Sequence, residues 1–325
     1  MNGTVTDTGR GNLVGAAVAA GAVGGGLALW SALAARAAER MVPADGSFIE
    51  VEGARVHYVE RGSGPVMLLV HGLLGNVRHF SHGMIDLLAR DFRVIAIDRP
   101  GSGYSVARGG TGQPGIEAQA RIVIAFADAL GLERPLLAGH SLGGAVALAA
   151  GLAAPDRFAA LALIAPLTQP MDSVPPVFAA LTVPPPLRTL MSWTIAVPAG
   201  MLMGQRSARE VFAPDPVPAD FATRGGGALS LRPAAFRAGS ADLRAAGAAM
   251  ATLAPRFGSL KPPVSILYGR QDNILAPALH GEATAATIPG ARIELVDGGH
   301  MLPIIHPERT AQFLRDAYAR TVDKG

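Results

Sequence analysis

The chain has 325 residues, of which half are hydrophobic and 16% are charged, so it can bury a large core in one or two domains. Its net charge of +3 comes mostly from scattered arginines, and no basic cluster interleaved with aromatic residues indicates nucleic-acid binding. The absence of cysteine excludes disulfides, thiolate metal sites and a cysteine nucleophile.

Residues 13–35 carry no charge and consist mostly of Ala, Gly, Val and Leu. As a helix, this run would cover about 35 Å, enough to span a bilayer. Trp30 lies toward one end, where aromatic side chains anchor spans. We therefore expect residues 1–41 to form a single N-terminal span that makes the protein membrane-associated. A signal peptide cleaved near residues 32–34, which would leave an exported protein, and a disordered tail are the alternatives.

From residue 42 onward, strand patterns alternate with helix patterns. Residues 48–51 and 55–59 alternate apolar and polar side chains, which predicts an antiparallel hairpin. Such alternation of strands and helices is typical of a mostly parallel, doubly wound sheet with helices on both faces, an α/β fold. The further strands are expected at 65–70, 92–97, 136–140 and 158–164, and the helices at 78–90, 116–130 and directly after Ser141.

Residues 167–257 interrupt this alternation with many prolines and with apolar helical patches at 177–181 and 190–203. This segment is too long for a loop, so we expect an inserted, mainly helical cap between two parts of the core, residues 42–166 and 258–325. The alternation then resumes with expected strands at 264–268 and 292–296 and expected helices from 277 and from 307 to about 318.

The sequence Gly-His-Ser-Leu-Gly at residues 139–143 stands between an apolar run and an Ala-rich helical pattern. A serine at such a tight strand-to-helix turn occupies strained backbone, and Gly139 and Gly143 supply the small neighbours that the turn needs. The turn also brings the Leu142 N–H to a helix N-terminus, where partial positive charge stabilises an oxyanion. Ser141 is therefore the candidate nucleophile, and the alternative is an incidental serine in a glycine-rich turn.

A serine nucleophile needs a base and an acid that orients the base. Asp272 follows the expected strand at 264–268, and His300 follows the next one. Because the carboxyl ends of parallel strands share one edge, we expect both side chains to converge on Ser141. Asp297 is an alternative acid, but it precedes His300 too closely to reach back easily.

Several short motifs follow one another in this order along the chain: His71-Gly72-Leu73-Leu74-Gly75, Asp98-Arg99-Pro100-Gly101-Ser102-Gly103, Gly139-His140-Ser141-Leu142-Gly143-Gly144, Gly269-Arg270-Gln271-Asp272 and Gly299-His300. With these motifs the chain resembles the α/β-hydrolase family, in the branch with a cap after the sixth strand. The resemblance covers about residues 47–320 and implies that Ser141, Asp272 and His300 form a catalytic triad. It further implies that the Leu73 and Leu142 N–H groups form an oxyanion hole, and that His71 and Asp98 shape loops without catalysing.

The remaining histidines are expected to be structural. His140 should pack beneath the turn, and His306 precedes a helix start. No His and carboxylate cluster has metal-ligand spacing, so neither a metal nor a cofactor is expected. The others of this group are His57, His79, His82 and His280.

The leading hypothesis is a serine hydrolase that cleaves carboxylic esters of small molecules through an acyl-enzyme. A cofactor-free perhydrolase or haloperoxidase, or a C–C bond hydrolase, would keep the same triad, whereas a nucleophilic aspartate is disfavoured because residue 141 is serine. A non-catalytic ligand-binding protein and a lipid-interface protein are the other classes.

The cap supplies apolar side chains for an acyl pocket, which would favour medium-chain or longer esters. The alternative is that these side chains only form the core of the cap. The side chains available are Met191, Trp193, Met201, Met203 and Phe212.

Overall fold

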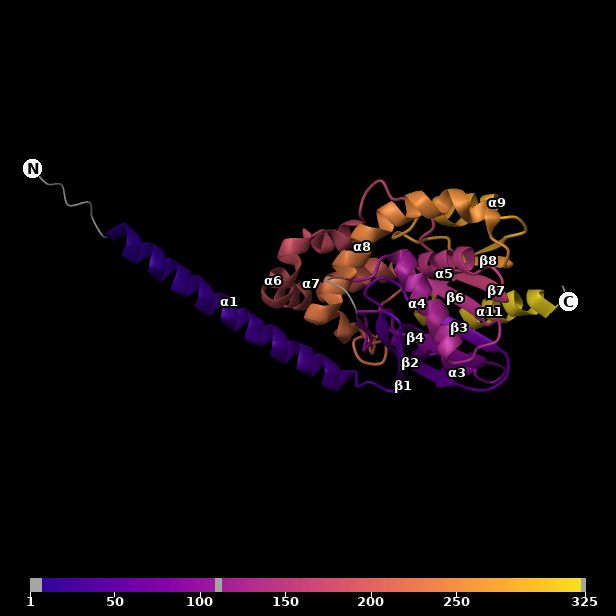
Figure 1. The fold of residues 1–325 in the computed structure, drawn as a ribbon, viewed down its shortest axis with the longest axis horizontal. Coiled ribbons are helices and arrows are strands. Elements are labelled where there is room, and N and C mark those ends of the chain that lie inside the picture. The colour runs from indigo at the N-terminus through magenta and orange to yellow at the C-terminus, as the bar shows by residue number, and fades with distance from the viewer. Residues whose placement is uncertain (1–7, 109–112, 323–325) are drawn as a thin grey trace, which may run out of the picture.

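The computed structural model describes residues 8–108 and 113–322. Residues 1–7 of the expected anchor and residues 323–325 of the second core part lie outside this description. The described chain forms one mixed sheet covered by helices, with a long N-terminal helix that leaves the body (Figure 1).

The sheet has nine strands in the order β1-β2-β4-β3-β6-β7-β8-β9, and the short β5 pairs with β2. The first two strands form the expected antiparallel hairpin, and β2 is antiparallel to β4. Every pair from β4 to β9 is parallel, which confirms the mostly parallel sheet. The strands are β1 Ser47–Val51, β2 Ala54–Arg61, β3 Val66–Val70, β4 Arg93–Ile97, β5 Val106–Ala107, β6 Leu136–His140, β7 Ala160–Ile164, β8 Val264–Gly269 and β9 Arg292–Val296.

Helices cover both faces of the sheet because successive strand residues point to opposite sides. In β3, Leu68 and Val70 join the core formed with α4 and α5, whereas Met67 and Leu69 join the core formed with α3 and α11. The expected doubly wound α/β fold is therefore confirmed. The helices of this part are α2 Arg78–Ser81, α3 Met84–Leu88, α4 Ile116–Ala129, α5 Leu142–Ala153, α9 Ala283–Thr287, α10 Leu302–Ile305 and α11 Pro307–Val322.

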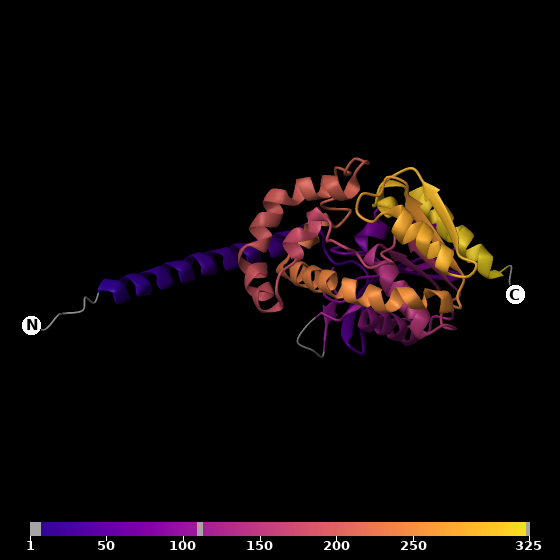
Figure 2. The same cartoon turned by 90° about the horizontal axis from the view of Figure 1, so that it is seen from above.

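Helices dominate residues 167–257, here named the cap segment. Figures 1 and 2 show α6 and α7 at the end of the body beside the N-terminal helix, while α8 runs back along the body. The C-terminal half of α8 buries Met250 and Leu253 in the core of α4 and α5. The segment and its border contain η1 Pro176–Leu181, α6 Pro185–Thr194, α7 Ala196–Phe212, η2 Gly227–Leu231, α8 Pro233–Leu253 and η3 Ala254–Ser259.

Several local expectations were wrong in detail. The apolar patch at 190–203 is two helices that meet at Ile195, with Pro198 in the first turn of α7, where a helix tolerates proline. The helix expected at 78–90 divides before Gly83, whose φ is −161°. The helix expected from 277 begins as a single π-helical stretch, Pro277–Glu282, and neither β5 nor α10 was expected.

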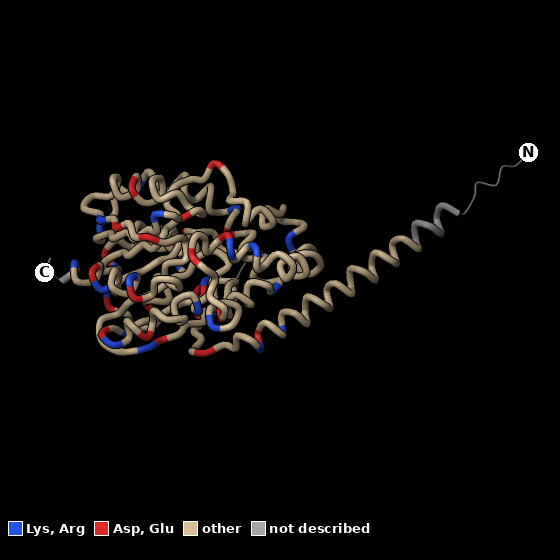
Figure 3. The backbone as a smooth tube through the Cα atoms, turned by 180° about the vertical axis from the view of Figure 1, so that it is seen from behind, with Lys and Arg blue, Asp and Glu red and all other residues tan. Residues whose placement is uncertain are grey.

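The N-terminal helix α1 extends over Thr8–Met41. Its segment Gly15–Met41 is long and apolar enough, by length and composition, to cross a membrane. On the part of α1 from Gly15 onward, Figure 3 shows no charged residue until the turns next to the folded body. There Ala38 and the following Val42 pack with Ala228 and Leu229 of η2.

Candidate active site

Ser141 occupies the sharp turn between β6 and α5. Its φ of 54° and ψ of −120° are unusual for a residue with a side chain. A Cβ on Gly139 would collide with the Gly143 carbonyl, and a Cβ on Gly143 would collide with the Val70 carbonyl. The turn can therefore form only because both neighbours are glycine.

The structure brings Ser141, His300 and Asp272 together, although they lie far apart in the sequence. His300 Nε2 is 3.0 Å from Ser141 Oγ, and His300 Nδ1 is 2.7 Å from Asp272 Oδ2. Since the carboxylate can only accept, Nδ1–H donates to it and leaves Nε2 as the acceptor for the serine hydroxyl. Asp272 is itself oriented, because Oδ1 accepts the N–H groups of Ile274 and Leu275 at 2.8 and 3.0 Å.

The alternative acid, Asp297, lies outside this arrangement. Its side chain is 91% exposed and its nearest charged neighbour is Arg270, at 3.9 Å. The side chains of His300 and Asp272 are 4% and 0% exposed. The geometry therefore favours Asp272 as the partner of His300.

The two predicted oxyanion residues flank the serine. Leu73 and Leu142 both line a small recess beside Ser141. Leu142 is the first residue of α5, where helix N–H groups lack an intrahelical acceptor. Gly72 approaches so closely that a Cβ there would lie 2.8 Å from the Ser141 Cβ.

A buried arginine holds the loop that carries Leu73. Arg99 donates from Nε to the His71 carbonyl and from Nη2 to the Gly72 carbonyl, both at 2.9 Å. From Nη1 it donates to Asp242 of α8 and to Gln119 of α4, both at 2.8 Å. One side chain thus ties the predicted oxyanion loop to a cap helix and to the core, a connection that sequence patterns did not reveal.

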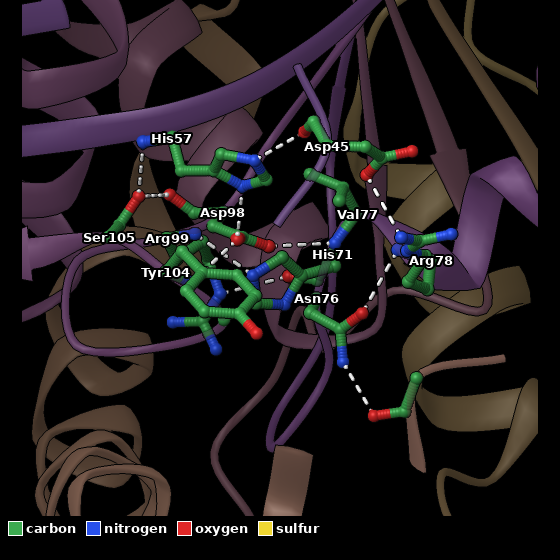
Figure 4. A network of polar contacts seen from close by, with 12 residues as sticks. Asp45, His57, His71, Asn76, Val77, Arg78, Asp98, Arg99, Tyr104 and Ser105 are labelled. Atoms are coloured by element: carbon green, nitrogen blue, oxygen red, sulfur yellow. Dashed lines mark hydrogen bonds and ion pairs between the residues drawn. The ribbon is translucent and has the colours of Figure 1, made fainter. Parts of the chain in front are cut away.

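The neighbouring loops are fixed by a polar network centred on Asp98 (Figure 4). Its carboxylate accepts from His57 Nδ1 at 2.7 Å and from the N–H groups of Val77 and Tyr104 at 2.8 Å. Burial disfavours the charged imidazole, but the hydrogen bond and charge of Asp98 prevail and raise the pKa of His57. His57 and Asp98 therefore hold the chain at Val77 and Tyr104 in place.

Three histidines near Ser141 are held neutral. Burial lowers the pKa of His71 and of His140, and lowers the pKa of His79 to about 4. His140 donates from Nε2 to the His300 carbonyl at 3.0 Å, and its ring lies against that of His300. A second positive charge next to His300 is thereby avoided.

Above Ser141 lies a cavity of about 320 Å³ between the core and the cap segment. Its lining contains no Asp, Glu, Lys or Arg, and its polar side chains are Ser141, Ser207, Ser230 and three histidines. Such a space fits an apolar ligand with a few polar groups at one end. Ser141, His140, His300 and His79 lie in the lining together with Leu73.

Of the cap side chains expected to line a pocket, Met191, Met203 and Phe212 do so. Trp193 of α6 and Met201 of α7 do not line this cavity, and both are exposed. Sequence reasoning assigned His79 a purely structural part and missed three aromatic side chains of the lining, Phe178, Phe221 and Phe236. Helical patterning alone does not define which side of an inserted helix faces a cavity.

The cap segment is also tied to the loop of His300. Asp215 Oδ2 accepts the Gly299 N–H at 2.8 Å. Over the described ranges, no group of three or more His, Asp and Glu side chains is arranged to hold a metal ion.

Comparison with known proteins places this arrangement in context. A family model for the alpha/beta hydrolase fold matches residues 65–307. Curated relatives match over shorter stretches. One is the dihydrolipoyllysine-residue acetyltransferase component of the acetoin cleaving system of Cupriavidus necator. It is 36% identical over 122 residues, which are 37% of this chain and 32% of that protein. Haloalkane dehalogenase 2 of Mycobacterium tuberculosis is 34% identical over 119 residues, 36% of this chain and 41% of that protein. The chain thus matches less than half the length of these relatives.

Solved structures match over more of the chain. An esterase from Thermogutta terrifontis has a TM-score of 0.67 at 24% identity and covers 85% of this chain and 99% of its own. A membrane phospholipase A, described as a bacterial virulence factor, has a TM-score of 0.66 at 23% identity and covers 96% and 97%. At these identities the likeness shows a shared fold.

Proposed function

Because the chain belongs to the α/β hydrolase fold family, we propose that it is a serine hydrolase that cleaves carboxylic esters through an acyl-enzyme intermediate. The observation that carries the proposal is the hydrogen-bonded series from Ser141 through His300 to Asp272 beneath an uncharged cavity. Residue 141 is serine, so the nucleophile is a hydroxyl and not a carboxylate.

In the first half of the reaction, Ser141 Oγ attacks the ester carbonyl while His300 Nε2 takes its proton. Asp272 keeps the His300 tautomer and stabilises the imidazolium that forms. The N–H groups of Leu73 and Leu142 donate to the oxygen that becomes negative. His300 then gives the proton to the leaving alcohol, and the acyl group stays on Ser141.

In the second half, water replaces the alcohol. His300 Nε2 takes a proton from the water as its oxygen attacks the acyl carbonyl, and the same two N–H groups stabilise the negative oxygen. The tetrahedral intermediate collapses, Ser141 Oγ regains the proton from His300, and the carboxylic acid leaves. The neutral state of His140 and His79 favours both halves, because a fixed positive neighbour would oppose the imidazolium of His300.

We propose further that residues 167–257 act as a cap over the site and that α1 anchors the protein in a membrane as a single span, with a cleaved signal as the alternative. The apolar length of α1 supports the anchor. The similar fold of a membrane phospholipase A agrees with it. The uncharged cavity supports an apolar acyl group as the substrate part bound by the cap.

The direct test is labelling with a fluorophosphonate, together with turnover of p-nitrophenyl butyrate, for Ser141→Ala and for Ser207→Ala as a serine control on the same cavity. The Ser141 variant should lose the label and about 10⁴- to 10⁶-fold in rate, while the Ser207 variant keeps the label. Near-normal turnover by Ser141→Ala would refute the nucleophile. Labelling of Ser141 without turnover of any ester would point to the perhydrolase, C–C hydrolase or ligand-binding alternatives.

The acyl preference is tested with p-nitrophenyl esters from acetate to decanoate. Each buried methylene should favour the transition state by at most about 0.8 kcal/mol until the cavity is full. The value of kcat/KM should therefore rise and then level off along the series. A profile that is flat, or that falls from acetate onward, would leave the catalytic proposal standing without an apolar acyl pocket.

A further inference from the structure

Helices α6 and α7, with Ile195 between them, expose several large hydrophobic side chains, here named the outer face. Among the described residues, all but three of the exposed large hydrophobic side chains lie either on α1 or on this face. Leu202 is 84% exposed and Leu190 is 62% exposed. The outer face consists of Leu187, Leu190, Trp193, Ile195, Met201, Leu202 and Met203. An exposed apolar patch of this kind marks an interaction surface.

The segment that carries the outer face has charges of one sign. Between Asp172 and Glu210 the chain contains no acidic residue, but it contains Arg188, Arg206 and Arg209. Apolar side chains bordered by arginines match the chemistry of a bilayer surface, where acyl chains lie beneath phosphate groups.

Helices α6 and α7, which carry the outer face, lie beside the helix that is long enough to span a bilayer (Figures 1 and 2). Packing against the body buries Ser31 of α1 completely, although Ser31 belongs to the uncharged run at 13–35. A span needs about 20 residues, and the uncharged run at 13–35 is little longer than that. The contact of the body with Ser31 therefore lies inside the hydrocarbon layer or at its border. A cap held at that level must meet lipid.

The junction between α1 and the body is fixed by polar contacts. The Tyr104 hydroxyl donates to the Val42 carbonyl at 2.6 Å, and Arg232 pairs with Glu39 at 2.9 Å. These contacts hold the last turns of α1 against the body, so the outer face keeps its position relative to the span.

The cavity above Ser141 reaches the outer face. Ile195 and Met203 line the cavity and are also 56% and 44% exposed. They therefore form a border between the cavity and the outer face.

From this arrangement we propose that the outer face inserts into the lipid bilayer that α1 spans, and that the cavity opens there and takes up ester lipids directly from the membrane. The occupant of the outer face is lipid, because α6 and α7 pack against α1 and the stretch from Leu187 to Met203 carries a single charged residue, Arg188. The substrate part of the inference rests on the proposed esterase function.

The insertion is tested independently of activity, because the chain has only two tryptophans. In full-length Trp30→Phe, Trp193 is the single reporter on the outer face. The protein is reconstituted into phosphatidylcholine vesicles with and without dibrominated acyl chains. Brominated lipid should quench Trp193, and acrylamide in the water should not. Quenching by acrylamide alone would overturn insertion, and protection from both quenchers would show that a second copy covers the face instead.

Uptake from the bilayer is tested with Leu190→Gln/Leu202→Gln, two outer-face residues that do not line the cavity. The matched control is Val106→Gln/Leu279→Gln, which changes two exposed apolar residues away from α6 and α7. With methylumbelliferyl oleate held in the vesicles, the outer-face variant should lose at least about tenfold in rate. With water-soluble p-nitrophenyl butyrate it should match the wild type, and the control variant should be unchanged on both substrates.

The outcomes separate the two proposals. Equal turnover of the vesicle-held ester by both variants would overturn lipid uptake through the outer face, even where butyrate hydrolysis stands. Absence of turnover of both esters in the wild type would refute the esterase function itself, while the Trp193 measurement would still decide insertion.

Discussion

At the scale of single residues, the two candidate acids of the site differ in burial and in hydrogen bonding. Asp272 is buried, accepts two backbone N–H groups and contacts His300, whereas Asp297 is in solvent. Only a carboxylate that is itself held in place can hold an imidazole in one tautomer.

Asp272→Asn is therefore expected to lower kcat on p-nitrophenyl butyrate by about 10⁴-fold, because the amide can donate to Nδ1 and favour the wrong His300 tautomer. Asp297→Asn, the matched change on the loop after the neighbouring strand β9, should leave kcat unchanged. Steady-state kinetics of both variants provide the measurement. A fully active Asp272→Asn paired with an inactive Asp297→Asn would reassign the acid.

Combination with the serine variant adds a second criterion. Ser141→Ala/His300→Ala should be no slower than Ser141→Ala alone, since the three side chains act as one unit. If the two losses multiplied instead, His300 would act on a step that does not involve Ser141.

At the scale of elements, the site depends on a strand, a turn and a helix that approach one another without side chains between them. Gly143 lies under the Val70 carbonyl of β3, and Gly139 lies against the start of α5. The requirement is steric, so it acts on folding as well as on the position of Ser141.

Gly143→Ala should lower the yield of folded protein and abolish fluorophosphonate labelling, because its Cβ has to displace backbone of β3. Gly247→Ala on α8, where a Cβ meets nothing within 4 Å, is the control. It should keep full labelling and gain up to about 1 kcal/mol in unfolding free energy. Circular dichroism and labelling of both proteins give the comparison, and a normally labelled Gly143→Ala would contradict the steric argument.

The connection between the core and the cap segment depends on the buried pair of Arg99 and Asp242, whose side chains are 1% and 0% exposed. Asp242→Ala leaves an uncompensated buried guanidinium and should lower the unfolding free energy by about 3–5 kcal/mol. It should also lower kcat, because Arg99 holds the loop of Leu73.

Asp156→Ala serves as its control. The side chains of Asp156 and Lys261 are 86% and 64% exposed and 3.7 Å apart, so this change should stay within about 0.5 kcal/mol. Urea unfolding in detergent micelles compares the two variants. A small effect of Asp242→Ala would mean that water or another acceptor reaches Arg99.

For the molecule as a whole, buried histidines dominate the expected pH dependence of stability. Burial lowers the pKa of His71, His79, His140 and His280, and that of His79 and His280 to about 4, while the pKa of His57 is raised. Below pH 6.5, the ordinary pKa of histidine, these four histidines bind protons in the unfolded chain but stay neutral in the folded protein. The contribution of His79 and His280 to stability is lost as the pH falls from 6.5 to about 4, and that of His71 and His140 is also lost as the pH falls below 6.5. His57, by contrast, stabilises below 6.5 and loses that effect as the pH rises through its folded pKa.

The unfolding free energy should therefore fall below pH 6.5. The slope should be about 1.4 kcal/mol per pH unit for each histidine kept neutral. His280→Asn retains an acceptor for the Thr168 and Gln169 N–H groups but does not titrate. Urea unfolding at several pH values should show a slope smaller by that amount in the variant. An unchanged slope would mean that His280 is protonated in the folded protein.

The sequence predicted the core better than the cap segment, for physical reasons. Alternating and continuous apolar runs define strands because burial has a period of two residues, and turn glycines define the elbow at Ser141. In the cap segment, α6 and α7 meet at Ile195 and are alike in amino-acid composition. The sequence pattern therefore could not predict where the first helix ends, or which side of each helix faces the cavity. Trp193 and Met201 were expected in the pocket and lie outside it, while His79 lies inside.

The fixed junction between α1 and the body has a consequence for kinetics. With α1 in a bilayer, the polar contacts of Val42 and Glu39 prevent the body from swinging away into solution. Enzyme and ester then meet by diffusion in two dimensions. The rate would depend on the mole fraction of ester in the leaflet and not on its amount per volume of solution, so inert lipid would act as a diluent of the substrate.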